Sequence, residues 1–181
     1  MGIVYIYILM SLNKNTGILI DRAINELRTG RPIVLGEKGN YWIFYNIEHA
    51  TKTIINQFKT IQDKETYLLI TKQKAKQLSP NKLNANIFFQ VSSNFNHSKF
   101  QDLFLNPANK TNKLNLKNLH LTKSKLFHNY ALELSKNAKL IPSLIFKKIN
   151  SKFNDDIDSV LSDMGLLKFK YSDLVNQNKH I

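Results

Sequence analysis

Cysteine is missing from this chain of 181 residues. Its absence excludes a disulfide framework, a thiol nucleophile and thiolate metal sites, and it fits a reducing, cytoplasmic location. An apolar run from Met1 to Met10 is too short to cross a bilayer. No basic residue precedes this run, as one would in an export signal. We therefore expect a buried β-strand at its place and no membrane partner.

Common catalytic and metal-binding motifs are also missing. No two of the five histidines have the H-x-x-x-H spacing of zinc ligands, and no G-x-S-x-G, Walker or G-x-G-x-x-G motif is present. The acidic residues Asp155, Asp156 and Asp158 stand where a helix is expected to start, which favours a capping role over a metal site. The sequence therefore predicts no catalytic and no metal-binding residues.

Arginine is scarce, although the chain carries a formal net charge of +13. From Lys72 to Lys152 there are fifteen lysines against Asp102 and Glu133, and all three arginines lie outside this basic block. A basic block is a feature of nucleic-acid-binding modules, but specific recognition of phosphates and bases favours arginine. Lysine, asparagine and isoleucine also have A/T-rich codons. Codon bias and a solvated surface are therefore favoured over binding of nucleic acid.

Apolar periodicity predicts alternating helices and strands. The expected helices are 18–29, 51–58, a short helix capped by Thr71, 95–105, 126–138 and 155–164, and the expected strands are 32–35, 41–47, 67–70, 87–91, 143–149 and 167–170. The fold class is α+β, with a mixed β-sheet flanked by helices. We expect one domain over 1–181, with an extra N-terminal strand and connection at 1–17 and a weakly ordered loop at 106–118.

An aromatic run stands on the expected strand 41–47. Stacking of bases on its rings is one interpretation. Alternation along a strand places Trp42 and Phe44 on the same face, which favours core packing for these two.

Two stretches resemble the 3,4-dihydroxy-2-butanone 4-phosphate synthase family of riboflavin biosynthesis. The first begins IDRAINELRTGRPIVL at 20–35 and continues through HATKTIINQF and LLITKQKAKQL. The second is ALELSKNAKLIPSLIFKKIN at 131–150, followed by YSDLVNQ. The resemblance implies the family's sandwich of sheet and helices and a homodimer. It also implies an activity that converts ribulose 5-phosphate to dihydroxybutanone phosphate and formate with Mg²⁺.

The motifs that carry this activity in the family are altered here. The family's long acidic loop is replaced by a shorter turn at 36–40 that retains one carboxylate, Glu37. The metal-binding G-H-T-E box aligns with Leu126-Phe127-His128-Asn129, so His128 replaces a ligand only if the register slips by one residue. The segment 94–118, where the family has substrate-binding threonine and arginine, contains no arginine. Two Mg²⁺ ions need more oxygen ligands than these residues supply.

The sequence thus favours a non-catalytic relative of this synthase family without catalytic residues, metal ligands or a cofactor. Residues of a residual pocket would be Glu37, His128 and Asn129. One alternative is an enzyme with a rebuilt site that acts on a sugar phosphate, in which a small phosphorylated ligand would bind. Another is a basic module that binds anions or nucleic acid.

Overall fold

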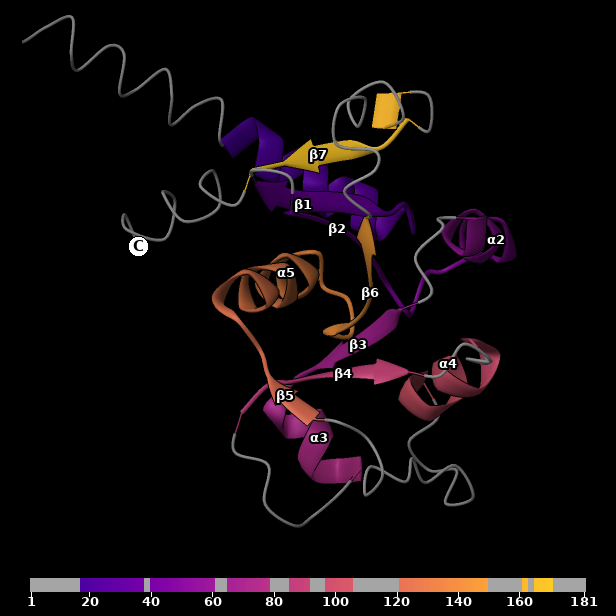
Figure 1. Cartoon of the computed structure of the whole chain (residues 1–181), viewed down its shortest axis with the longest axis vertical. Coiled ribbons are helices and arrows are strands. Elements are labelled where there is room, and N and C mark those ends of the chain that lie inside the picture. Colours follow the sequence, from indigo (N-terminus) through magenta and orange to yellow (C-terminus); the bar gives the residue numbers. More distant parts are fainter. Residues whose placement is uncertain are drawn as a thin grey trace, which may run out of the picture.

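A seven-stranded sheet forms the centre of the molecule, with the strand order β5-β4-β3-β6-β2-β1-β7 (Figure 1). The computed structural model describes residues 17–37, 40–60, 65–78, 85–91, 97–105, 121–149, 161–162 and 165–170. The strands are β1 Ile33–Glu37, β2 Asn40–Asn46, β3 Thr66–Ile70, β4 Ile87–Val91, β5 Leu121–Lys123, β6 Ser143–Ile149 and β7 Leu167–Phe169.

Most neighbouring strands in this sheet are antiparallel, and β7 alone pairs in parallel, with β1. The strands β1 and β2 form the expected hairpin, in which Leu35 lies opposite Trp42. Trp42 in turn lies opposite Lys148 of β6. The sheet is therefore mixed, which confirms the α+β class expected from the sequence.

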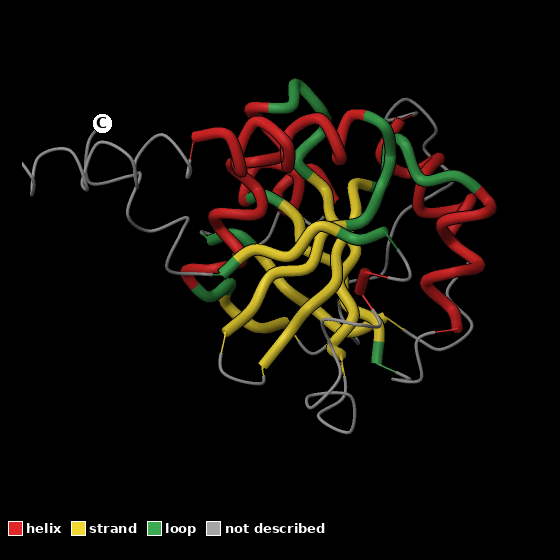
Figure 2. Tube along the Cα trace, turned by 90° about the horizontal axis from the view of Figure 1, so that it is seen from above, coloured by secondary structure: helices red, strands yellow, loops and turns green. Residues whose placement is uncertain are grey.

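Helices cover both faces of the sheet (Figures 1 and 2). The first described helix spans 17–28. The others are α2 Lys52–Thr60, α3 Lys72–Leu78, α4 His97–Leu105 and α5 Leu126–Asn137. Ala75 of α3 and Phe104 of α4 pack on one face, whereas Ala131 of α5 packs on the other. The helices thus form two layers with the sheet between them.

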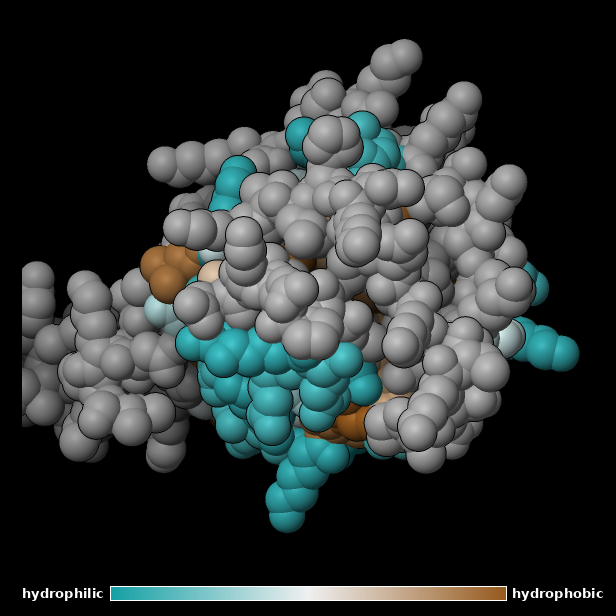
Figure 3. Space-filling model, turned by 90° about the horizontal axis from the view of Figure 1, so that it is seen from below, coloured by the Kyte–Doolittle hydropathy of each residue, from teal (hydrophilic) through white to brown (hydrophobic). Residues whose placement is uncertain are grey.

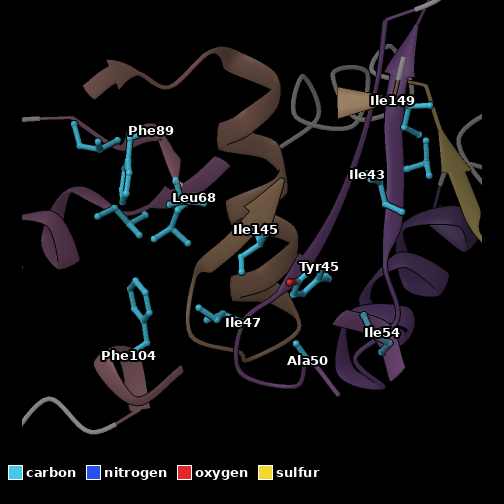
Figure 4. Packing of buried hydrophobic residues seen from close by; sticks show 14 of the residues in the cluster. Ile43, Tyr45, Ile47, Ala50, Ile54, Leu68, Phe89, Phe104, Ile145 and Ile149 are labelled. Atoms are coloured by element: carbon cyan, nitrogen blue, oxygen red, sulfur yellow. The ribbon is translucent and has the colours of Figure 1, made fainter. Parts of the chain in front are cut away.

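Two hydrophobic clusters, one on each face, make up the core. The first, here called the α3-side core, includes Tyr45, Ile54, Leu68, Ile145 and Phe104, several of which point toward one another in Figure 4. The second, here called the α5-side core, includes Leu27, Phe44, Phe88, Leu132 and Phe146. Burial of this apolar surface supplies most of the driving force for folding.

Local signals in the sequence set several element boundaries. Gly30 follows the helix 17–28 with φ +77°, and a Cβ at this position would collide with the carbonyl oxygen of His49. Only glycine meets both requirements without strain. The Thr71 Oγ1 accepts a hydrogen bond of 3.2 Å from the Lys74 N–H, which confirms Thr71 as the cap of α3. Phe44 is buried in the α5-side core and Trp42 packs against it, as the alternation predicted.

The sequence missed one strand. Leu121–Lys123 pairs with β4 as β5, but this segment has one apolar residue in three and shows no alternation. The expected N-terminal strand, the loop 106–118 and most of the helix 155–164 lie outside the described residues. Residues 161–162 are helical, and the first described helix begins at 17, one residue before the expected start at 18. Within the described part of the chain, no helix is long and apolar enough to span a membrane.

Candidate functional site

His128 lies in the first turn of α5, and its imidazole is turned into the molecule. The side chain is only 2% exposed. Its ring stacks on Phe88 with the centroids 3.9 Å apart, and it contacts Phe146 and Trp42 edge to face. Neighbouring Phe127 packs against it at 3.9 Å. The residue that aligns with a metal-binding box in the family therefore lies inside a cluster of aromatic rings.

A backbone hydrogen bond fixes the tautomer of this imidazole. The Lys125 N–H donates to the His128 Nδ1 at 3.0 Å, so that Nδ1 is the unprotonated nitrogen and Nε2 carries the proton. Nε2 is buried and has no hydrogen-bond partner among the described residues. Burial, with a smaller contribution from the charge of Lys125, lowers the pKa of His128 to about 3. The ring is therefore neutral near pH 7.

The rings around His128 also pack on one another. Tyr67 and Phe88 stack with centroids 4.7 Å apart, and Trp42 meets both edge to face at 5.6 and 5.8 Å. These side chains come from β2, β3 and β4; β3 and β4 are direct neighbours in the sheet, and β6 lies between β3 and β2. Such pairs stabilise beyond their area burial by about 0.5–1.5 kcal/mol each. We call Trp42, Tyr67, Phe88, Phe127, His128 and Phe146 the aromatic cluster.

Asn129, the next residue, points to a different set of partners. Its Oδ1 accepts hydrogen bonds from the Asn86 Nδ2 at 2.9 Å and from the Ser124 Oγ at 2.8 Å. The Asn86 Oδ1 accepts from the Lys72 N–H at 2.9 Å. Asn129 therefore connects the start of α5 to the starts of α3 and β4, which is a structural role.

Glu37 is the last residue of β1 and lies opposite Asn40 of β2. The Glu37 side chain itself is outside the described part of the structure. Of the three residues expected in a residual pocket, His128 and Asn129 are adjacent, but they bind different partners.

The described side chains do not fit a divalent metal ion. A histidine ligates through an unprotonated nitrogen, and the one on His128 already faces a backbone N–H. The Asn129 oxygen is likewise occupied by two donors. In the described ranges no group of three or more histidine, aspartate or glutamate residues is arranged to hold a metal.

A cavity of about 200 Å³ lies elsewhere, next to α3. Its lining residues are Thr71, Gln73, Lys74, Gln77, Ile141, Pro142 and Ser143. Neither His128 nor Asn129 is among its described lining residues. The sequence contained two weak indications of this site: the polar residues Gln73, Lys74 and Gln77 on one expected helix, and Ser143 ahead of three apolar residues in an expected strand. Only the packing of α3 against the entry to β6 brings these signals together.

Comparisons with solved structures identify the fold. A 3,4-dihydroxy-2-butanone 4-phosphate synthase in complex with two magnesium ions superposes with a TM-score of 0.64 at 11% identity, over 88% of this chain and 96% of the other. The synthase of Candida albicans gives 0.61 at 12% identity, over 87% and 96%. A two-domain synthase from A. baumannii gives 0.62 at 13% identity, over 86% of this chain and 56% of the other. This chain therefore has the synthase fold, as the resemblance implied.

Sequence comparison does not extend this likeness. No protein-family model matches the chain, and no curated protein matches it by sequence.

Proposed function

We propose that this chain is a non-catalytic relative of the 3,4-dihydroxy-2-butanone 4-phosphate synthases. The observation that carries the proposal is the state of His128. Its Nδ1 accepts a backbone hydrogen bond, and its ring packs within the aromatic cluster. The synthase fold supports the ancestry, and the aromatic cluster supports the loss of a metal centre.

The chemistry of the family explains why this loss is severe. The reaction on ribulose 5-phosphate, as the resemblance implies it, passes through enediolate charge that Mg²⁺ would stabilise, with a positioned acid and base. Mg²⁺ demands a near-octahedral set of oxygen ligands and keeps its waters. The packed rings around His128 leave no room for that hydration shell, and the hydroxyl that the aromatic cluster does contain, on Tyr67, is hydrogen-bonded to Glu65. The residues at this position thus favour packing over catalysis.

The direct test is release of formate. Purified protein with ribulose 5-phosphate and Mg²⁺ is expected to release no formate above the rate of a heat-denatured sample. A synthase of known activity, assayed in parallel, controls the substrate and the detection. Turnover on the order of 1 per second, typical of an ordinary enzyme, would contradict the proposal.

Metal binding provides a second test that does not depend on activity. A ligand that binds only the folded state stabilises it by about 2.7 kcal/mol at 100 times its Kd, which raises the Tm by about 5–10 °C for a domain of this size. We expect Mg²⁺ and Mn²⁺ to leave the Tm unchanged. A saturable rise that disappears in Glu37→Gln, but persists in the matched variant Glu65→Gln, would show that a metal site survives.

The alternative of nucleic-acid binding gains little support from the described lysines of the basic block. Lys72 and Lys76 are exposed on α3, whereas Lys136 is exposed on α5, on the opposite face of the sheet. A nucleic-acid site would gather its lysines along one groove beside exposed aromatic rings. This distribution supports a solvated surface. The homodimer and the cytoplasmic location remain predictions.

A further inference from the structure

The cavity next to α3 is lined on one side by that helix and on the other by the chain that enters β6. Thr71, Lys74 and Gln77 belong to α3 and its cap, and Ser143 is the first residue of β6. Ser143 stands two positions before Ile145, a member of the α3-side core, so strand alternation turns its side chain toward α3. Figure 3 views the molecule from the side on which α3 lies in Figure 1, where the described surface is mostly hydrophilic.

The lining of the cavity has the chemistry of an anion site. Among the described lining residues Lys74 is the one that carries a charge, and none is a carboxylate. The other polar side chains are two amides and two hydroxyls, Gln73, Gln77, Thr71 and Ser143, all of which can donate hydrogen bonds. Ile141 and Pro142 add an apolar wall. An occupant that matches this lining is negatively charged and rich in acceptor oxygens.

Ser143 gives an independent indication that something polar binds here. Its side chain is fully buried, and its Oγ has no hydrogen-bond partner among the residues that the structure describes. Buried hydroxyls in proteins are almost always paired. On the other face of the sheet, buried Ser135 follows this rule, because its Oγ accepts from Asn46 and donates to the Ile141 carbonyl. Ser143 is also a lining residue of the cavity, so a ligand there would give its covered hydroxyl the missing partner once a small movement of the lining exposed it.

A contact with an aromatic ring restrains the Lys74 side chain. Its Nζ lies 5.1 Å from the centroid of the Phe104 ring of α4, a cation–π distance. Burial lowers the pKa of its ammonium group, so a bound anion would stabilise the charged form. No carboxylate is paired with it in an ion pair within the described ranges. Its charge is therefore available to a ligand.

We propose that this cavity binds a small molecule through a phosphate group, with Lys74 as the counter-charge and the side chains of Gln73, Gln77 and Ser143 as further donors. A phosphate offers three acceptor oxygens, which suits this number of donors better than the two of a carboxylate. A volume of about 200 Å³ equals that of about six or seven water molecules in the liquid. The occupant is therefore a phosphate ion or a short phosphorylated compound. This proposal is independent of whether the chain is catalytic.

The test is a titration with inorganic phosphate and with glycerol 3-phosphate, at constant ionic strength, followed by ¹H–¹⁵N NMR. We expect saturable shifts confined to 71–78 and 141–143, with a Kd of roughly 1 mM or tighter. Lys74→Gln should weaken binding about tenfold, as loss of a hydrogen bond to a charged group does. The matched control is Lys76→Gln, which removes the same charge from an exposed position on the same helix.

A second variant separates binding from folding. Ser143→Ala removes only the unpaired hydroxyl, so the protein should fold normally while its affinity for phosphate falls about threefold or more. Tighter binding of glycerol 3-phosphate than of phosphate would identify a phosphorylated metabolite, and equal binding would identify the phosphate group alone. Both outcomes support the site. If Lys74→Gln and Lys76→Gln weakened phosphate binding equally, the binding would depend only on the net positive charge, and the proposal would be wrong. The absence of saturable shifts would also overturn it.

Discussion

Each face of the sheet has a buried polar atom without a described partner, but the surroundings of the two atoms differ. On the α5 side, where the resemblance places a metal-binding box, this atom is the His128 Nε2, which is enclosed by aromatic rings, and Ser135 nearby is fully hydrogen-bonded. On the α3 side, Ser143 is buried without a described partner beside a cavity that Lys74 borders. The packed rings on the α5 side stabilise the fold and leave no room for a ligand. The cavity on the α3 side leaves polar side chains that can bind one. Three substitution or pH experiments test this contrast.

The largest decrease in the free energy of unfolding is expected from a substitution in the aromatic cluster. Phe88 is nearly buried and stacks on both Tyr67 and His128. Phe88→Ala should lower the free energy of unfolding by about 3–5 kcal/mol, because it removes these contacts and leaves a cavity. Urea denaturation measures the change. The control Leu105→Ala, at a position 40% exposed, should cost much less. Similar costs for both variants would show that the aromatic cluster is loosely packed.

A smaller decrease in the free energy of unfolding is expected when the pH is lowered. The pKa of His128 is about 3 in the folded protein, against 6.5 for an unperturbed histidine. Between these values the unfolded chain binds the proton and the folded protein does not, so stability falls as the pH falls. The stabilisation is complete above pH 6.5, and about 2 kcal/mol of it should be lost between pH 7.5 and 5.

Urea denaturation at several pH values, on the protein and on two variants, tests this assignment. His128→Phe keeps an aromatic ring in the cluster but removes the titrating group, so its stability should depend less on pH in this range. His49→Gln, at an exposed position, should retain the full dependence. Equal pH dependence in the native protein and in His128→Phe would remove His128 as the cause.

The smallest changes in the free energy of unfolding are expected for substitutions of the two buried serines, which should differ from each other. Ser135→Ala deprives the Asn46 amide of one partner and should cost about 1–2 kcal/mol. Ser143→Ala removes a hydroxyl that no described group binds, and the free energy of unfolding without ligand should change by less than about 0.5 kcal/mol. Chemical denaturation in phosphate-free buffer measures both variants. A cost at Ser143 equal to that at Ser135 would contradict the contrast between the faces.

Some of this architecture was predictable from the sequence. The apolar alternation in 41–47 placed Phe44 and Trp42 on one face, and the helical period in 126–138 located α5 to within one residue. Gly30 and Thr71 marked boundaries through their own backbone and side-chain chemistry. These are local properties, because each depends on residues a few positions apart. The strand β5 was missed because its three residues show no apolar alternation, so that only its pairing with the distant β4 identifies it as a strand.

The period of each element, the absence of thiol and common metal motifs, and the positive charge follow from the sequence alone. The role of each polar residue depends on the tertiary structure. His128 lies among aromatic rings because α5 packs over β4 and β6, and Asn129 accepts one hydrogen bond from nearby Ser124 and one from distant Asn86. The tertiary structure also places Lys74 beside Ser143, residues that are far apart in the chain. Solvation, partner and protonation state depend on which elements pack together, and that information is not contained in any local stretch of sequence.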